Sequence, residues 1–328
     1  MLHVKVQDGV IDSSRWAHAA GVHVRIDRLY LLDGKHGSVN LGHTLGDEVI
    51  AVWRALEMWG LLEEPVHVYL NDITATKPYH VLNLAKPPVL ASSGLNESTC
   101  FESFVVGWSN FGYMPTINPN YRPPDTVPKS YLNRFRDYSW RRFGAVGLPI
   151  GHWPPRITIV CKGTAFSMFK AAILNVDALK HAFETRFGAR VELAVWQGMP
   201  LAKQVQIMSQ TDVMLSLPGS DLMNAVWLPT KSAIVVPWRY ILGWTSKGRD
   251  TDAEWHPSNE VRLWFDHIPF RQVISFNPAL DPSTKLDNST GGVELGINRT
   301  SATVEDALVH LAQLRVLNSM ALHGRIGD

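Results

Sequence analysis

Residues 212–237 contain the pattern with the clearest capacity to bind a charged ligand. A turn at Gly219 follows a short apolar run, and Ser220 or Asp221 can cap a helix that Pro229 stops. A second apolar run comes next, so the pattern predicts strand, tight turn, short helix and strand. In a parallel sheet such a turn lies at the carboxyl end of a strand, where free helix N–H groups attract an anion such as phosphate. On the turn alone, an ordinary strand–helix connection without a ligand stays open.

Two titratable side chains near the N-terminus, His43 and Asp47, have a spacing suited to acid–base chemistry. They lie four positions apart, which places both on one face at the start of a predicted helix. Either group can accept a proton from a hydroxyl. The alternatives are a histidine bonded to the backbone at the helix entry and an aspartate that interacts with the helix dipole. Asn40 is predicted to shape the turn before this helix.

The sequence Asp250-Thr251-Asp252 has the form that can hold a divalent cation on a diphosphate. Such a pair normally follows a buried strand, whereas this one follows a polar stretch at residues 245–249, which favours a solvated loop. Nearby His256, Asp266 and His267 lack the regular spacing of metal ligands. We therefore predict no metal and no cofactor, and a metal site at Asp250 and Asp252 stays open as an alternative.

The second half of the chain alternates strand and helix patterns, and these elements must position the turn at Gly219. The predicted strands cover residues 156–162, 190–196, 212–217 and 232–236. The predicted helices cover residues 176–187 and 201–210, and a last helix runs from a Thr303 cap to His323. Strands that alternate with helices predict a parallel, doubly wound α/β sheet. Between residues 239 and 287 the pattern weakens, and no element is predicted there.

The first half is less regular but has the same kind of elements. Predicted strands cover residues 22–32, 66–70 and 100–107, and predicted helices cover residues 49–59 and 129–143. A cluster of proline and glycine at residues 147–155 is typical of a domain linker. We therefore predict an N-terminal domain over 1–150, a C-terminal domain over 151–300, and a C-terminal helix over 301–328 that packs back on the N-terminal domain.

Composition excludes several classes of protein. The 328 residues are 45% hydrophobic and 19% charged, which is normal for a folded globular chain. The 31 basic and 30 acidic residues leave a net charge of +1, so nothing indicates a nucleic-acid partner. Two cysteines cannot form a disulfide scaffold, and Cys161 is predicted to be a buried free thiol. No run reaches the length of a membrane span.

Several motifs together resemble glycosyltransferase family 61. They are Asn40-x-x-His43-x-x-x-Asp47, Cys100-Phe-Glu with Val106-Gly107, the strand at 156–162, Asn175, and the Pro-Gly-Ser-Asp-Leu-Met-Asn run at 218–224. The resemblance covers roughly residues 40 to 237 and is tightest at 156–237. The family includes plant xylan arabinosyl- and xylosyltransferases and animal enzymes that add N-acetylglucosamine to O-mannose or directly to protein.

The resemblance implies a GT-B architecture, in which two Rossmann-like domains face a central cleft. It implies an inverting transfer of a pentose or N-acetylglucosamine from a UDP-sugar to a glycan or glycoprotein acceptor. The donor is expected on the C-terminal domain, and Asp47 or His43 is expected to deprotonate the acceptor. The residues expected to hold the nucleotide sugar are Lys162, Lys170, Gly219, Ser220, Asp221 and Asn224.

The chain departs from the family pattern at three positions. Lys162 and Lys170 stand where the family has arginines, and Pro218 stands where it has histidine. Lysine keeps the positive charge but lacks the bidentate fork that suits a diphosphate. These departures motivate an alternative hypothesis, a non-catalytic relative that binds a nucleotide or a glycan.

Two features bear on the cellular compartment. Asn-x-Ser/Thr sequons at Asn96, Asn288 and Asn298 favour a Golgi lumen, whereas the absence of an N-terminal apolar core favours the cytoplasm. The expectation is a Golgi lumen for a eukaryotic source, with the anchor missing from this chain, and otherwise the cytoplasm.

Overall fold

The computed structural model describes residues 24–32, 45, 49–58, 60–63, 67–70, 90–91, 99–106, 131–149, 152–161, 172–217, 220–237, 272–276, 278, 281–287 and 292–323. The chain forms two compact units, one from residues 1–40 and 48–110 and the other from residues 41–47 and 111–328. Helix α4 (Tyr131–Phe143) therefore lies in the second unit, although it precedes the linker predicted at 147–155.

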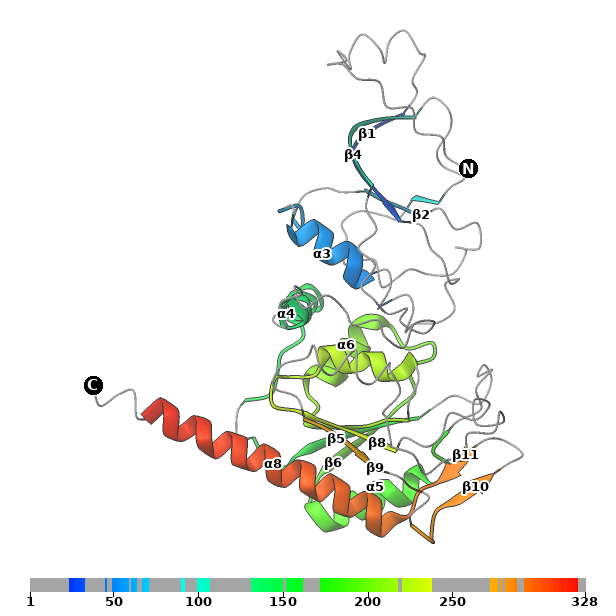
Figure 1. Cartoon of the computed structure of the whole chain (residues 1–328), viewed down its shortest axis with the longest axis vertical. Helices are drawn as coiled ribbons and strands as arrows, with labels where there is room; N and C mark the ends of the chain where they lie inside the picture. The colour runs from blue at the N-terminus through cyan, green and yellow to red at the C-terminus, as the bar shows by residue number, and fades with distance from the viewer. Residues whose placement is uncertain are drawn as a thin grey trace, which may run out of the picture. The chain divides into compact units, whose positions relative to one another are not determined.

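The first unit contains a parallel sheet of four strands in the order β3-β2-β1-β4 (Figure 1). These strands are β1 (Val24–Leu32), β2 (His67–Leu70), β3 (Leu90–Ala91) and β4 (Thr99–Val106). Helix α3 (Ile50–Met58) connects β1 to β2, and its Trp53 and Leu56 are buried. It ends where Gly60 takes a φ of 68°, a left-handed conformation that glycine adopts without strain.

The second unit is built on a parallel sheet of five strands in the order β6-β5-β7-β8-β9. The strands are β5 (Arg156–Val160), β6 (Arg190–Ala194), β7 (Val213–Leu215), β8 (Ala233–Pro237) and β9 (Gln272–Phe276). Helices connect the first four of these strands along the chain, as the alternating pattern predicts: α5 (Val176–Phe187), α6 (Leu201–Ser209) and the 3-10 helix η4 (Ser220–Trp227). The predicted parallel α/β sheet is confirmed for this unit.

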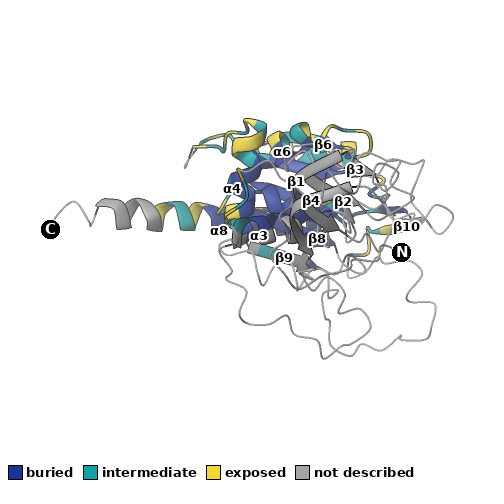
Figure 2. Cartoon of the chain, turned by 90° about the horizontal axis from the view of Figure 1, so that it is seen from above, coloured by how far each residue is buried: buried dark blue, intermediate teal, exposed yellow. Residues whose placement is uncertain are grey.

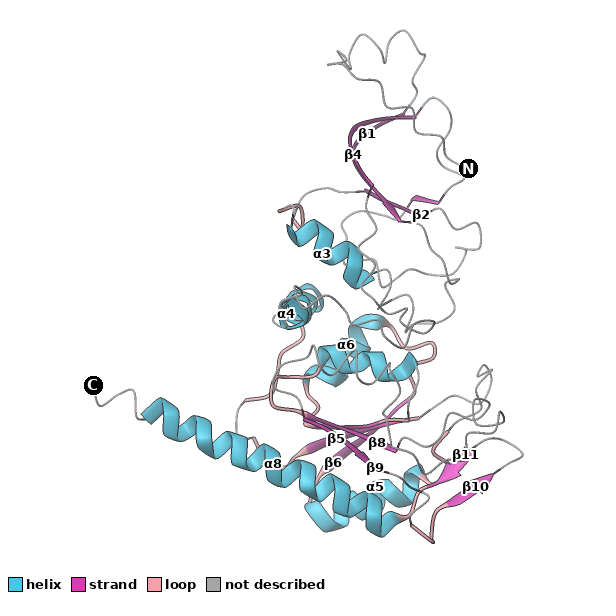
Figure 3. Cartoon of the chain, in the orientation of Figure 1, coloured by secondary structure: helices cyan, strands magenta, loops and turns pink. Residues whose placement is uncertain are grey.

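Helices cover both faces of this sheet, as Figure 3 shows. Helices α5 and α8 (Ile297–His323) lie on one face, and α6, η4 and α4 lie on the other. Every residue of β7 and β8 is buried, because central parallel strands are apolar on both faces. The buried residues gather around the sheet, and the exposed ones lie on the outer sides of the helices (Figure 2).

The last helix differs from its predicted start. Helix α8 begins at Ile297, and the Thr303 hydroxyl donates to Arg299 O inside the helix at 3.0 Å, so Thr303 is not the cap. Gly296 precedes the helix, and a Cβ at this position would lie 2.0 Å from Asp281 Oδ2. Helix α8 packs on α5 and on β7, β8 and β9, all within its own unit.

Residues 239–287, for which no element was predicted, contain strand β9 and strand β10 (Lys285–Asp287). Strand β10 pairs antiparallel with β11 (Gly292–Glu294). No helix among the described residues has the length and apolar character needed to cross a membrane.

Candidate functional site

Strands β5 and β7 lie side by side, and the chain leaves them in opposite directions. From β5 it passes to β6 on one side, and from β7 to β8 on the other. Where the strand order reverses in this way, an open parallel sheet leaves a crevice at its carboxyl ends, and ligands bind there. These ends are Val160, followed by Cys161, and Leu215, followed by Ser216 and Leu217. We call this place the switch point.

Three of the predicted site residues lie in the helix that begins after the carboxyl end of β7, next to the switch point. Ser220, Asp221 and Asn224 lie in η4, the helix that follows the carboxyl end of β7. The other predicted site residues lie outside the described part of the chain and stay predictions: Lys162, Lys170, Gly219, His43 and Asp47. Pro218, Asp250 and Asp252 lie outside it as well.

Asn224 is fully buried, and its side-chain oxygen has no hydrogen-bond partner among the described residues. Its Nδ2 donates to Asp221 O at 3.3 Å, one turn earlier in η4. A buried amide oxygen without a donor costs free energy, so such atoms usually meet a water or a ligand. Among the described residues of η4, Asn224 therefore has a side-chain oxygen that is available to accept a hydrogen bond from a ligand or a water.

Helix η4 is held firmly by the layer of helices above the sheet. Residues 222–228 are all buried, and Trp140 of α4 donates its ring N–H to Trp227 O at 3.0 Å. The predicted stop at Pro229 is confirmed, but the helix is 3-10 rather than α: Leu228 N donates to Ala225 O three residues back, at 3.1 Å. The packing on α4 and α6 fixes the position of this helix relative to β7.

Asn175, part of the motif at the start of α5, has a structural role. Its Nδ2 donates to Leu295 O at 2.8 Å, and its Oδ1 accepts from Leu295 N at 3.0 Å. Both ends of the amide are thus used to join the start of α5 to the segment between β11 and α8. This pairing spans 120 positions of sequence, so the motif alone gave no sign of it.

Cys161 lies at the carboxyl end of β5 as a free, half-buried thiol. Burial raises its pKa to about 11, with a further contribution from the nearby Asp177 carboxylate and a partial offset from a backbone hydrogen bond at Ala194. The thiol is therefore protonated at neutral pH. This agrees with the expected free thiol, although the side chain is only partly enclosed.

We expect Cys161 to react slowly with iodoacetamide at pH 7, because the thiolate is the reacting form. With a pKa of about 11, the rate should rise roughly tenfold for each pH unit up to pH 11. Mass spectrometry of the Cys161 peptide at several pH values measures this, with the urea-unfolded chain as the control. A folded chain that reacts at pH 7 as fast as the unfolded chain would contradict the assignment.

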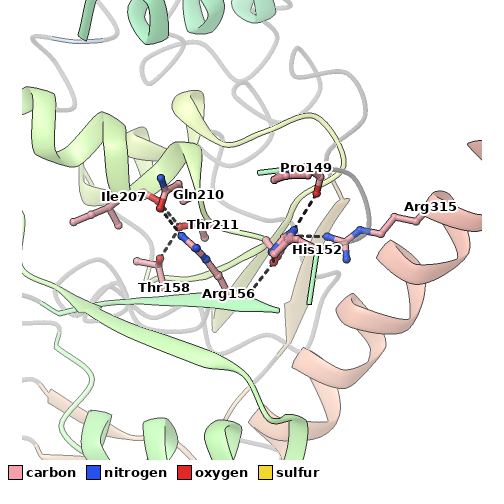
Figure 4. A network of polar contacts seen from close by, with 9 residues as sticks. Pro149, His152, Arg156, Thr158, Ile207, Gln210, Thr211 and Arg315 are labelled. Atoms are coloured by element: carbon pink, nitrogen blue, oxygen red, sulfur yellow. Dashed lines mark hydrogen bonds and ion pairs between the residues drawn. The ribbon is translucent and has the colours of Figure 1, made fainter. Parts of the chain in front are cut away.

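A second polar cluster lies at the opposite, amino end of the strands (Figure 4). The buried Asp212 carboxylate accepts Arg156 N at 2.8 Å and contacts Arg315 Nη2 of α8 at 2.6 Å. His152 Nε2 lies 2.9 Å from the same carboxylate, while its Nδ1 lies 3.2 Å from Pro149 O. Asp212 thus joins β5, β7, α8 and the segment before β5. Its role is structural, and sequence reasoning did not detect it.

Comparison with known proteins assigns the class. A family model described as Glycosyltransferase 61 matches residues 114–235, which include α4 and everything from β5 to the middle of β8. The class of protein defined by this segment is a sugar transferase. More particularly, the match is to glycosyltransferase family 61, and it supports the resemblance stated from the motifs over residues 114–235.

One solved structure similar to this chain is the bacterial iron-containing dodecameric glycosyltransferase TibC from enterotoxigenic E. coli H10407. The TM-score is 0.34 and the identity 13%, over 65% of this chain and 58% of that one. This chain thus spans little more than half of that protein's length. No curated protein matches the chain.

Proposed function

We propose that this protein is an inverting glycosyltransferase that moves a pentose or N-acetylglucosamine from a UDP-sugar to a glycan or glycoprotein acceptor. The observation that carries the proposal is the switch point within the family 61 segment. The turn at Gly219 and the residue Lys162 follow the carboxyl ends of the two strands between which the sheet order reverses. The proposal includes the GT-B architecture that the family resemblance implies.

The donor diphosphate needs positive charge as it leaves. In the proposed complex, Lys162, Lys170 and the N–H groups at Gly219 and Ser220 supply it, so no metal is required. Carboxylates cannot neutralise phosphate, so Asp221 is assigned to hydroxyl groups of the nucleotide sugar, as is the unpartnered oxygen of Asn224.

The proposed reaction is a single displacement. The acceptor oxygen forms a bond to the anomeric carbon of the sugar while the bond from that carbon to the diphosphate breaks, and UDP leaves with the electron pair. The hydroxyl proton passes to Asp47, or to His43 held by Asp47. Attack from the face opposite the leaving group inverts the anomeric centre. The sequons Asn96, Asn288 and Asn298 favour the Golgi lumen as the compartment.

A second candidate is a non-catalytic member that binds a nucleotide or glycan. Lys162, Lys170 and Pro218 favour it, because they replace two arginines and a histidine of the family pattern. Slow hydrolysis of the UDP-sugar in the absence of an acceptor separates the two candidates: a catalyst shows it and a binding module does not.

Replacing Gly219 by valine should abolish UDP binding, because the branched side chain blocks the close approach of backbone N–H groups to the diphosphate. Calorimetric titration of UDP into the parent and the variant measures this. Gly219→Ala is the graded control, and the melting temperature shows whether each variant is folded. A folded Gly219→Val chain that binds UDP as tightly as the parent would place the nucleotide elsewhere.

A further inference from the structure

A hollow of about 400 Å³ lies at the amino ends of β5 and β6, on the face of the sheet that α6 covers. We call it the β5–β6 hollow, and its polar lining residues are Arg156, Thr158, Arg190, Glu192, Lys203, Gln206, Gln210 and Thr211. Its volume lies in the range of small-molecule sites. The switch point is at the other end of β5, about 13 Å away along the strand.

The register of β5 and β6 explains why this hollow is polar. Arg156 pairs with Arg190, and Thr158 pairs with Glu192, so all four side chains lie on the same face of the sheet. The opposite face carries Ile157, Ile159, Val191 and Leu193, which join the core under α5 and α8. Strand β6 is at the edge of the sheet, and its Arg190 and Glu192 are exposed rather than covered.

Positive charge dominates the lining. Arg156, Arg190 and Lys203 bring three cations, and Glu192 is the one acid among the lining residues. Neither Arg190 nor Lys203 forms an ion pair within the described part of the chain. Like charges on directly neighbouring strand positions repel each other. The Arg156–Arg190 pair is therefore a place where a bound anion would relieve repulsion.

Hydrogen bonds fix the Arg156 side chain at the rim of the hollow (Figure 4). Its Nη1 donates to Gln210 Oε1, and its backbone N is held by Asp212. The Thr211 hydroxyl donates to Ile207 O at 2.9 Å, so Thr158 must be the donor in the 2.7 Å contact with Thr211. Both hydroxyl protons are taken up by these contacts, which leaves the guanidinium groups, Lys203 and the amide N–H₂ groups of Gln206 and Gln210 as the side-chain donors of the lining.

We propose that the β5–β6 hollow binds a phosphate monoester of about monosaccharide size, such as a sugar phosphate. Adjacent strands lie about 4.8 Å apart, so the two guanidinium groups can each offer paired N–H donors to one phosphate. The phosphate dianion matches the excess of two positive charges that Arg156, Arg190 and Lys203 have over Glu192. The volume that the phosphate leaves free accommodates a sugar ring. This site is independent of the nucleotide site proposed at the switch point.

The test is calorimetric titration with glucose 6-phosphate, inorganic phosphate and glucose. We expect glucose 6-phosphate to bind, inorganic phosphate to bind more weakly, and glucose not to bind. Arg190→Ala should weaken glucose 6-phosphate binding by about tenfold or more, the loss typical of a charge-assisted hydrogen bond. Glu192→Gln should strengthen it several-fold, because it removes the one acid of the lining. Lys180→Ala, which changes a partly exposed lysine on α5 across the sheet, is the control and should leave binding unchanged.

Three outcomes would overturn the proposal: no binding of glucose 6-phosphate, equal binding of glucose, or binding that Arg190→Ala leaves unchanged. If glucose 6-phosphate does not bind, the charged side chains of the hollow serve only to keep the edge strand of the sheet solvated. Saturating UDP separates this site from the switch point. Glucose 6-phosphate binding should persist in its presence, whereas displacement by UDP would place the phosphate at the switch point and refute the second site.

Discussion

Asp212→Ala is expected to lower the free energy of unfolding by about 3 kcal/mol, because it leaves Arg315 and the backbone N–H of Arg156 without their shared acceptor in a largely buried place, and removes the carboxylate beside His152. The carboxylate joins the amino ends of β5 and β7, the two strands of the switch point. Urea unfolding of the purified variant measures the loss.

Two further variants serve as controls for the predicted loss of stability in Asp212→Ala. Asp212→Asn keeps an acceptor for Arg156 N but removes the charge, so about half of the loss should remain. Glu305→Ala breaks the exposed pair between Arg186 and Glu305 and should cost less than about 1 kcal/mol. An Asp212→Ala protein within about 1 kcal/mol of the parent would show that the cluster is not a structural centre.

Asp47→Asn is expected to lower turnover with saturating UDP-sugar by roughly a hundredfold or more, because the amide keeps the shape of the side chain and cannot take the acceptor proton. Donor affinity should stay unchanged, since Asp47 is proposed to act on the acceptor hydroxyl and is not among the residues proposed to hold the donor. Turnover and calorimetric donor affinity are measured on the same preparation.

The pair of measurements separates the roles open to Asp47. Near-normal turnover would remove this residue from the mechanism. A joint loss of turnover and donor affinity would make it a structural residue. His43→Gln is the companion variant, and a larger loss than that of Asp47→Asn would assign the proton transfer to His43 with Asp47 as its holder.

Local patterns were sufficient to predict the alternating elements of the second unit. Helix α5 ends at Gly188 in the left-handed conformation, as the sequence predicts, since only a local turn is involved. Strand β9 was not predicted, although residues 272–276 read Gln-Val-Ile-Ser-Phe, because the surrounding Trp-, His- and Asp-rich sequence obscured a run of only five residues. The start of α8 was misplaced because Thr303 fits a cap signature while bonding within the helix.

The helix after β7 was predictable because it depends on a short stretch of chain: an apolar run precedes it and Pro229 follows its end. The contacts of Asp212 with Arg315, 103 positions away, have no local signal. The β5–β6 hollow depends on the register that aligns Arg156 with Arg190, and no pattern within either strand determines that register.

The central claim is that the donor nucleotide binds at the switch point. Hydrogen–deuterium exchange of the parent protein, with and without saturating UDP, tests it most directly, because amide protection reports where a ligand stabilises the chain. We expect slower exchange in peptides that cover Ser216 to Trp227 and the segment after Cys161. Confirmed UDP binding with unchanged exchange in those peptides, or with protection confined to residues 190–211, would contradict it.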